Sequence, residues 1–299
     1  MIKTPTALIL GAGASKPFGF PTGHELKESI VANIRPQVNS TLRNSLRDLG
    51  IPEDEVHSFF AALKDSGRSS VDAFLEYRTE FLKVGKYAIA LSLMPYEEHH
   101  RLFQFDGKAA DWYEYLFNKT NTSFEMFDHN ELYIITFNYD RSLEYYLFTA
   151  LKNSFNMSEE KCAEKMKGMP IIHVYGALCA LPWQGGISRP YMPGLSPDNV
   201  KNASDQILIM SECSYKSEQF ERAYQILYKV KRIYFLGFGY GEANLERLGL
   251  SSLPSKYMAG TALGLEDAET TPINRSLGIQ FPDNNSDVLQ FLKKHGPLD

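Results

Sequence analysis

A glycine-rich segment, Gly11–Ser15, directly follows the short apolar run Thr6–Leu10 near the start of the chain. Small residues at such a place let backbone N–H groups approach an anion closely, and a following helix would add the positive end of its dipole. The segment therefore favours binding of a pyrophosphate, as in a dinucleotide. The pattern is incomplete, because the third glycine of the usual fingerprint would fall at Lys16, so a simple tight turn explains it about equally well.

Two polar residues, Asn138 and Asp140, follow the apolar run Tyr133–Phe137. The carboxyl ends of parallel strands line the ligand crevice of an open α/β sheet, so both side chains are expected at the same rim as Gly11–Ser15. Asp140 is also a natural helix N-cap, and Asn138 is a common turn residue. A structural role and a functional role are both open for these two residues.

A histidine lies inside the next apolar run, Ile171–Tyr175, which ends before a glycine. Side chains two residues apart on a strand share a face, so His173 and Tyr175 are expected together, with Tyr175 nearer the crevice. A lone strand histidine is more often a hydrogen-bonded core residue than a catalyst, but its place near the rim keeps catalysis open. Gly237 and Phe238 close another buried strand at the same rim.

Short apolar runs alternate with helical patterns along most of the chain. The runs predicted as strands are Thr6–Leu10, Tyr133–Phe137, Ile171–Tyr175, Ile207–Met210, Ile233–Phe238 and Thr261–Leu265. After Ser214, apolar residues recur at helical spacing at Phe220, Ala223, Tyr224, Leu227 and Val230. Strands that alternate with such helices predict the α/β class, with a doubly wound, largely parallel, Rossmann-like sheet.

The interval between the first two predicted strands breaks this alternation. Residues 25–130 are mostly helical in pattern, as in Val71–Leu93, and are predicted to form a helical insertion or subdomain. Residues 131–299 would form the remainder of the Rossmann-like core, so that 1–299 is one domain. The segment Leu181–Asn202 is dense in proline and glycine, which predicts an irregular loop across the sheet edge.

Composition excludes several classes of protein. The formal net charge is −5 and basic residues form no stripe, so direct binding of nucleic acid is not expected. Cys162, Cys179 and Cys213 lie far apart, which argues against a disulfide framework and a thiolate metal site and fits a cytoplasmic protein. No apolar run approaches the roughly 20 residues that cross a bilayer, so no membrane association is expected.

Taken together, these segments resemble the sirtuin-like domains of bacterial antiphage defence, relatives of the sirtuin deacetylases that hydrolyse NAD. The resemblance rests on motifs that occur in the family's order and extend over most of the chain. They are Gly11–Ser15 with Phe20–Gly23, the Thr-x-Asn-x-Asp pattern at Thr136–Asp140, His173–Gly176, and Gly237–Gly239.

The resemblance implies roles for individual residues. Asn138 would hold the nicotinamide ribose and the attacking water, Asp140 would support the pocket, and His173 or Tyr175 would complete the catalytic set. Cleavage of the glycosidic bond passes through a ribosyl cation, which polar groups at a strand end can stabilise. The residues implied in binding NAD are Gly11, Ala12, Gly13, Ser15, Thr22, Gly237, Phe238 and, as a weaker candidate, Gly264.

The chain departs from sirtuins in two respects. It lacks the four cysteines of their zinc module, so neither a metal nor deacetylation is expected. The family's catalytic histidine usually stands immediately before the glycine, where this chain has Tyr175. Either His173 supplies the general base, or Tyr175 replaces it, or turnover is weak.

The leading hypothesis is an NAD glycohydrolase that produces ADP-ribose and nicotinamide and is held inactive until triggered. The resemblance implies a homo-oligomer and a partner such as a HerA-type ATPase or an Argonaute-like protein. One alternative is a catalytically silent module that senses NAD or ADP-ribose or serves as an assembly subunit. A redox dehydrogenase is a weaker alternative, because no acidic residue follows the second strand to hold a ribose.

Overall fold

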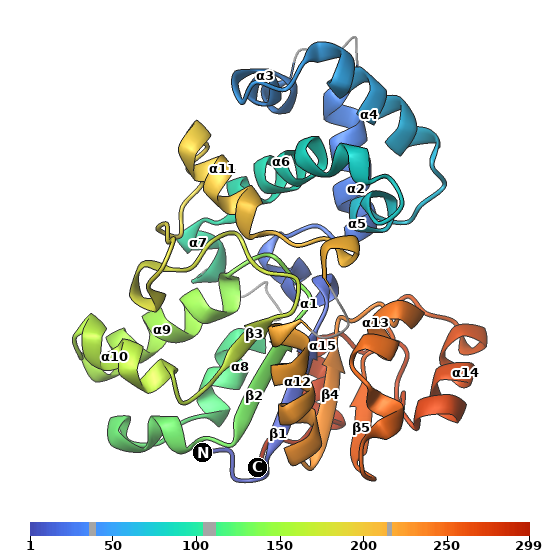
Figure 1. Cartoon of the computed structure of the whole chain (residues 1–299). Coiled ribbons are helices and arrows are strands. Elements are labelled where there is room, and N and C mark those ends of the chain that lie inside the picture. The colour runs from blue at the N-terminus through green and yellow to red at the C-terminus, as the bar shows by residue number, and fades with distance from the viewer. Residues whose placement is uncertain (36–39, 104–111, 214–216) are drawn as a thin grey trace.

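A parallel sheet forms the centre of the computed structural model, which describes residues 1–35, 40–103, 112–213 and 217–299 (Figure 1). Within these ranges the sheet has five strands in the order β3-β2-β1-β4-β5, and all neighbours pair in parallel. The strands are β1 (Thr6–Leu10), β2 (Leu132–Thr136), β3 (Ile171–His173), β4 (Arg232–Leu236) and β5 (Tyr257–Gly260). The predicted α/β class with a parallel sheet is confirmed.

Helices cover both faces of this sheet, which explains why its strands are continuous apolar runs. They include α8 (Trp112–Lys119), α9 (Ser142–Phe155), α10 (Glu159–Met166), α12 (Glu218–Lys229) and α15 (Val288–Lys294). Figure 1 shows α12 on one face of the sheet and α15 on the other. Phe220 of α12 packs on Tyr175, just after β3, and Tyr234 of β4 packs on Phe291 of α15. All five residues of β1, the central strand, are buried.

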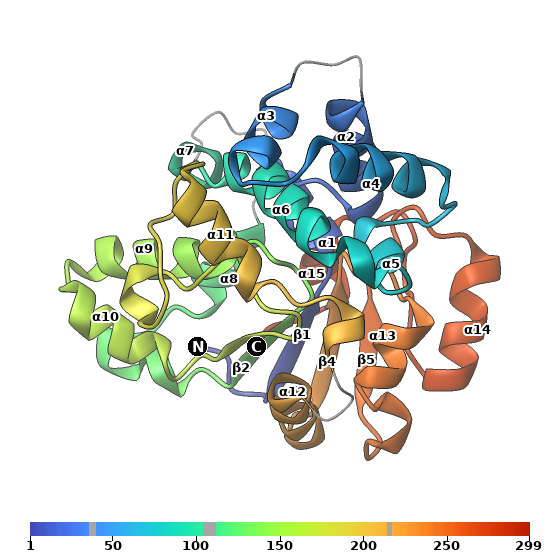
Figure 2. The ribbon, with the colours of Figure 1, turned by 45° about the horizontal axis from the view of Figure 1, so that its top comes forward.

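A helical part lies over the carboxyl ends of the strands (Figures 1 and 2). It comprises α2 (Gly23–Ile34), α3 (Thr41–Asp48), α4 (Glu53–Asp65), α5 (Val71–Leu75), α6 (Leu82–Leu93) and α7 (His99–Leu102). Phe59, Phe74 and Phe81 join α4 to α5 and to the turn directly before α6, with ring centroids 5.8–5.9 Å apart. The helical pattern expected in 25–130 is therefore present in its described residues, whereas 36–39 and 104–111 lie outside them.

The other helices follow strand ends or connect strands. They are α1 (Ala12–Ser15), α11 (Pro197–Gln206), α13 (Glu242–Arg247) and α14 (Asp267–Leu277). The two chain termini lie together at the edge of the molecule opposite the helical part, where the N–H of Lys3 donates to Asp299 at 2.8 Å (Figure 1). The strands thus direct their carboxyl ends, and the loops that follow them, toward the helical part.

Two predicted strands are wrong. Ile207–Met210 is a connection between α11 and a short 3₁₀ turn, and only Ile207 forms an isolated bridge, to Gly176. Thr261–Leu265 follows β5 instead of forming it, because the chain turns there and the N–H of Leu265 donates to Ala262 at 2.9 Å. Ile207 and Ile209 are buried without forming a strand ladder, and Leu263 is exposed, so the apolar character of a run does not by itself identify a strand.

One prediction about an irregular segment also needs correction, and the helical pattern of Val71–Leu93 can be described more closely. Leu181–Asn202 is not irregular throughout, because α11 begins at Pro197, with Ser196 as its N-cap. Proline is favoured in the first turn of a helix, so this proline starts a helix and does not interrupt one. Val71–Leu93 contains two α-helices, α5 and α6, separated by a 3₁₀ turn at Thr79–Phe81.

No helix in the described ranges is both long enough and apolar enough to span a membrane.

Candidate functional site

A cleft runs along the carboxyl ends of the strands, beneath the helical part. Its larger portion, the apolar half, is a cavity of about 640 Å³ lined mainly by Pro17, Phe238, Ala262, Leu263, Leu265 and Val288. The other portion, the polar half, is a cavity of about 380 Å³ whose lining includes Asp72, Glu76, Asn138, Tyr175, Glu242 and Asn244. Ala12, Gly23, Phe238 and Gly239 line both halves, so the halves adjoin. Each volume suits a small-molecule site.

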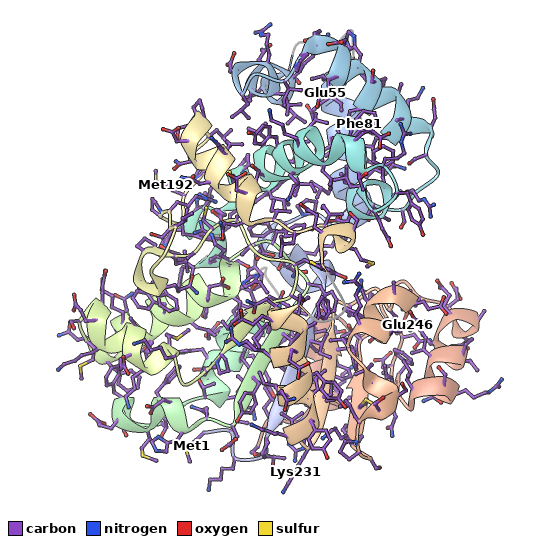
Figure 3. All side chains as sticks on the ribbon, viewed as in Figure 1. Met1, Glu55, Phe81, Met192, Lys231 and Glu246 are labelled. Carbon is purple, nitrogen blue, oxygen red and sulfur yellow. The ribbon has the colours of Figure 1, made fainter. Side chains whose placement is uncertain are left out.

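The cleft lies between regions that the sequence separates widely. In Figure 3 the label Phe81 marks the helical part, and Lys231 marks the amino-terminal ends of the strands. The carboxyl ends of the strands lie between these two labels. The polar half takes one wall from α5 and the other from the loops after β2, β3 and β4. An elongated ligand could therefore extend from under α5 to the loops after β4 and β5.

The glycines of Gly11–Ser15 serve mainly to pack two loops together. The N–H groups of Gly11 and Gly13 donate to Leu236 at 3.1 Å and to Gly237 at 3.0 Å. A Cβ atom on Gly11 would stand 2.5 Å from the carbonyl oxygen of Gly237, so a side chain there would force the loops apart. These two N–H groups are therefore not available to a phosphate, and Ala12, which lines both halves, is the residue of this turn best placed to meet a ligand.

The amide of Asn138 has a defined orientation. Its Nδ2 donates to the carbonyl oxygen of Gly11 at 3.0 Å and to Oγ of Ser15 at 3.1 Å. Since a carbonyl oxygen only accepts, the nitrogen must face Gly11, and the amide oxygen is left for other partners. No donor in the described residues reaches this oxygen. Asn138 lines the polar half, where its oxygen can accept from a hydroxyl group or face a positive charge.

Asp140 is not the N-cap of α9, as its position suggested, because that residue is Arg141, but the carboxylate of Asp140 lies against the start of the helix. One carboxylate oxygen accepts from the hydroxyl of Ser15 at 2.8 Å, and the other accepts from the N–H and hydroxyl of Ser142, the first residue of α9. Burial raises the pKa of Asp140, while these hydrogen bonds oppose the rise. Asp140 thus anchors the start of α9 and, through Ser15, the amide of Asn138.

His173 does not line either half of the cleft, and the expectation that it faces the same way as Tyr175 is wrong. Its Nδ1 lies 2.8 Å from the carbonyl oxygen of Asn138, and its Nε2 lies 2.9 Å from Oε1 of Glu144. Burial by itself lowers the pKa of His173, but the Glu144 carboxylate raises it overall. Strand β3 ends at His173, so strand alternation does not extend to Tyr175. His173 supports the backbone of Asn138 from behind.

Tyr175 is the member of this pair that lines the polar half. Its hydroxyl donates to Oδ1 of Asn244 at 2.8 Å, and its ring packs edge-on against Phe137 and Phe220. Burial raises the pKa of Tyr175 well above its ordinary value. The residue therefore faces the cleft as a neutral phenol, which makes it a poor general base.

The remaining predicted residues line the apolar half. Gly237, Phe238 and Gly264 do so as expected for loops after β4 and β5. Thr22 lines it too, but its hydroxyl is used in the capping box of α2, where it donates to Glu25 at 2.9 Å. Lys16 bonds to the same Glu25 at 2.8 Å, and together with Thr22 it lowers the pKa of Glu25 to about 2.

Asp72 is a cleft residue that the sequence did not reveal. It is the second residue of α5 and half-buried, and its carboxylate accepts a hydrogen bond from the hydroxyl of Tyr139. An acid after the N-cap Ser70 is an ordinary feature of a helix start, so no local signal distinguishes it. Glu144 was visible as an acid within the apolar stripe of α9, a position where a buried charge needs a partner.

A buried ion cluster lies behind the polar half. Arg141, which follows Asp140, donates to both oxygens of Glu97, at 2.9 and 2.6 Å. Arg189 also donates to Glu97, and the side chains of all three are at most 2% exposed. Arg141 and Arg189 donate further to backbone carbonyls such as those of Ala180 and Met192. The cluster fixes the start of α9 to the loop after β3.

The groups facing the cleft suit an organic ligand. They are carboxylates, an amide oxygen and phenols, which match hydroxyl groups and positive charge. Within the ranges that the structure describes, no three His, Cys, Asp or Glu side chains gather in a way that could hold a metal ion.

In comparisons with known proteins, no family model matches the chain, and no curated protein matches it.

Proposed function

We propose that the cleft binds an NAD-type dinucleotide and hydrolyses the bond between nicotinamide and ribose, giving nicotinamide and ADP-ribose. The observation that carries this proposal is the amide of Asn138. Gly11 and Ser15 hold its nitrogen, so its oxygen is available at the rim of a cavity that also contains carboxylates. A preorganised oxygen of this kind stabilises positive charge that develops during a reaction.

In the proposed reaction, the polar half holds the bond between nicotinamide and ribose while it is hydrolysed. The C1′–N bond of the ribosyl nicotinamide breaks, its electron pair stays on the nicotinamide nitrogen, and water adds to C1′. The transition state carries positive charge on the ribose, which the amide oxygen of Asn138 and the carboxylates of Asp72, Glu76 and Glu242 would stabilise. Nicotinamide leaves as a neutral base.

The apolar half suits the adenosine end of the same ligand. Apolar side chains such as Phe238, Leu263 and Val288 would cover the base, while the shared residues Ala12 and Gly239 lie where the pyrophosphate would cross. We take the helical part between β1 and β2 as an insertion into a Rossmann-like core, which closes the cleft from above.

The decisive experiment measures nicotinamide release from NAD by the purified chain and by an Asn138→Ala variant. We expect this variant to lose at least about 100-fold in rate, the usual loss when one group that stabilises transition-state charge is removed. Asn153→Ala, on the exposed side of α9, is the matched control and should retain the wild-type rate. Equal rates for wild type and Asn138→Ala would reject the proposal.

One observation favours the alternative of a silent module that senses NAD or ADP-ribose. His173 is enclosed by Asn138 and Glu144, so the histidine expected to act as general base has no access to the cleft. Saturable binding of ADP-ribose without nicotinamide release under any condition would support this alternative over hydrolysis.

The wider proposal, based on the family resemblance, is a cytoplasmic, homo-oligomeric effector of antiphage defence under the control of a partner. Uncontrolled loss of NAD would kill the cell that makes the protein, so activity should depend on a HerA-type ATPase, an Argonaute-like protein or a similar partner. Purification together with the neighbouring gene product, followed by the NAD assay, tests this dependence.

A further inference from the structure

Asp72 stands out among the groups that face the polar half. It also lines a small cavity of about 80 Å³ that contains Asn138 and Asp140. The hydroxyl of Tyr139, the residue next to Asn138, donates its single proton to Asp72 and also lies 3.2 Å from the carbonyl oxygen of Leu208. The loop that presents the amide of Asn138 therefore also positions the carboxylate of Asp72, although 66 positions separate Asp72 from Asn138 in the sequence.

The general-base candidates that the sequence pointed to are occupied or remote. Glu76 and Glu242 also line the polar half, but of these three carboxylates only Asp72 also lines the small cavity beside Asn138. Both oxygens of Asp140 already accept hydrogen bonds, from Ser15 and Ser142. His173 faces away from the cleft. By contrast, Tyr139 is the only side chain that donates to Asp72 within the described ranges, so one carboxylate oxygen has no side-chain donor there.

We propose that Asp72 is the catalytic carboxylate of the polar half, accepting a proton from the water that attacks the ribosyl cation. This inference rests on the hydrolysis proposed above. The C1′–N bond breaks with its electrons on nicotinamide, the water oxygen bonds to C1′, and the water proton passes to Asp72 and then to solvent. The step needs no oxidant, reductant or further reactant.

The surroundings of Asp72 suit this role. Burial raises its pKa, the hydrogen bond from Tyr139 opposes the rise, and the net pKa lies above the ordinary value of 3.8. The titratable groups that share a cavity with it are Tyr139, Tyr175, Asp140, Glu242 and Glu76, the residue that follows α5. A raised pKa makes the carboxylate a stronger base, while its negative charge attracts the ribosyl cation.

The test compares Asp72→Asn with wild type in the NAD assay, together with the partner if activity requires it. We expect kcat to fall at least about 100-fold, within the usual range for loss of a general base, with little change in KM. Asp65→Asn, an exposed acid at the end of α4, is the matched control and should keep the wild-type kcat. Added formate should partly restore activity to Asp72→Ala, which a purely structural role would not allow.

Tyr139→Phe provides a second measurement in case Asp72→Asn fails to fold. The hydrogen bond from Tyr139 lowers the pKa of Asp72, so its loss should raise that pKa. The acid limb of the kcat–pH profile should then move to higher pH. An unmoved acid limb, or an Asp72→Asn variant with more than about one tenth of the wild-type kcat, overturns the assignment of Asp72. In both cases the Asn138→Ala result still decides the proposed function. A wild-type chain that never releases nicotinamide overturns both.

Discussion

The two halves of the cleft are built by different means. The polar half depends on side chains from distant parts of the chain, held by hydrogen bonds such as Tyr139 to Asp72 and His173 to Glu144. The apolar half depends on backbone packing between the loops after β1 and β4, with apolar side chains around it. Under the proposed function, the apolar half would bind the adenosine end of the ligand and the polar half would hold the bond that is cleaved.

The halves should therefore respond differently to substitution. Replacement of one polar group behind the polar half leaves other buried polar groups without partners, which is costly. In the apolar half, stability depends on glycines such as Gly237, which let the backbones of the loops after β1 and β4 pack in direct contact. Three predictions test this contrast, beginning with the largest expected effect.

Glu97→Gln should strongly destabilise the protein. The substitution removes the carboxylate between Arg141 and Arg189 and leaves two buried guanidinium groups without their counter-charge. Loss of one member of a buried ion pair costs about 3–5 kcal/mol, so the free energy of unfolding, measured by denaturant titration, should fall by about that amount.

The neighbouring residue supplies the control for this prediction. Glu98 pairs with Arg101 at 2.7 Å near the surface, where such pairs contribute no more than about 1 kcal/mol. If Glu97→Gln were no more harmful than Glu98→Gln, the buried cluster would not be what holds the polar half in place.

Gly237→Ala should disturb the junction between the halves. Gly237 has a φ of +56°, and a Cβ there would stand 2.1 Å from the nitrogen of Ala14. Backbone strain and overpacking together should cost about 2–3 kcal/mol in the free energy of unfolding and weaken ADP-ribose binding. Gly239→Ala is the matched control, because a Cβ at Gly239 meets no atom within 4 Å. Similar stabilities for the two variants would contradict backbone packing as the basis of the apolar half.

The smallest predicted effect is a pH dependence of stability that arises from His173. Glu144 raises the pKa of His173 in the folded protein above its ordinary value of 6.5. A raised pKa favours the protonated form on folding, so the stabilisation is complete below about pH 6.5 and declines as pH rises through the folded pKa.

Denaturant titrations from below pH 6.5 upward measure how the contribution of His173 to the free energy of unfolding changes with pH. The difference in free energy of unfolding between wild type and Glu144→Gln should be largest at low pH and should shrink as pH rises. Glu159→Gln, which alters an exposed pair with Lys152, should show no such trend. A difference for Glu144→Gln that stays constant with pH would mean that His173 is not protonated against Glu144.

Much of the fold could be predicted because local patterns report burial directly. Thr6–Leu10 was predicted with the same bounds that β1 has. All five of its residues are buried, and a short apolar run of this kind is typical of a strand in a parallel sheet that is covered on both faces. Ile207–Met210 has similar apolarity and was wrongly predicted as a strand. Whether an apolar run pairs with a neighbour or fills a loop depends on contacts that only the folded chain creates.

The same distinction holds for the candidate site. The sequence alone placed Asn138, Asp140 and Phe238 at strand ends, and parallel strands necessarily bring their carboxyl ends to one rim. It could not show that His173 faces Glu144, or that Asp72 meets Tyr139 across the cleft. These are hydrogen bonds between elements, and periodicity within one element carries no information about its partner. The sequence thus determined the strands and the rim, while tertiary structure decided which acids face the cleft and which groups lie behind it.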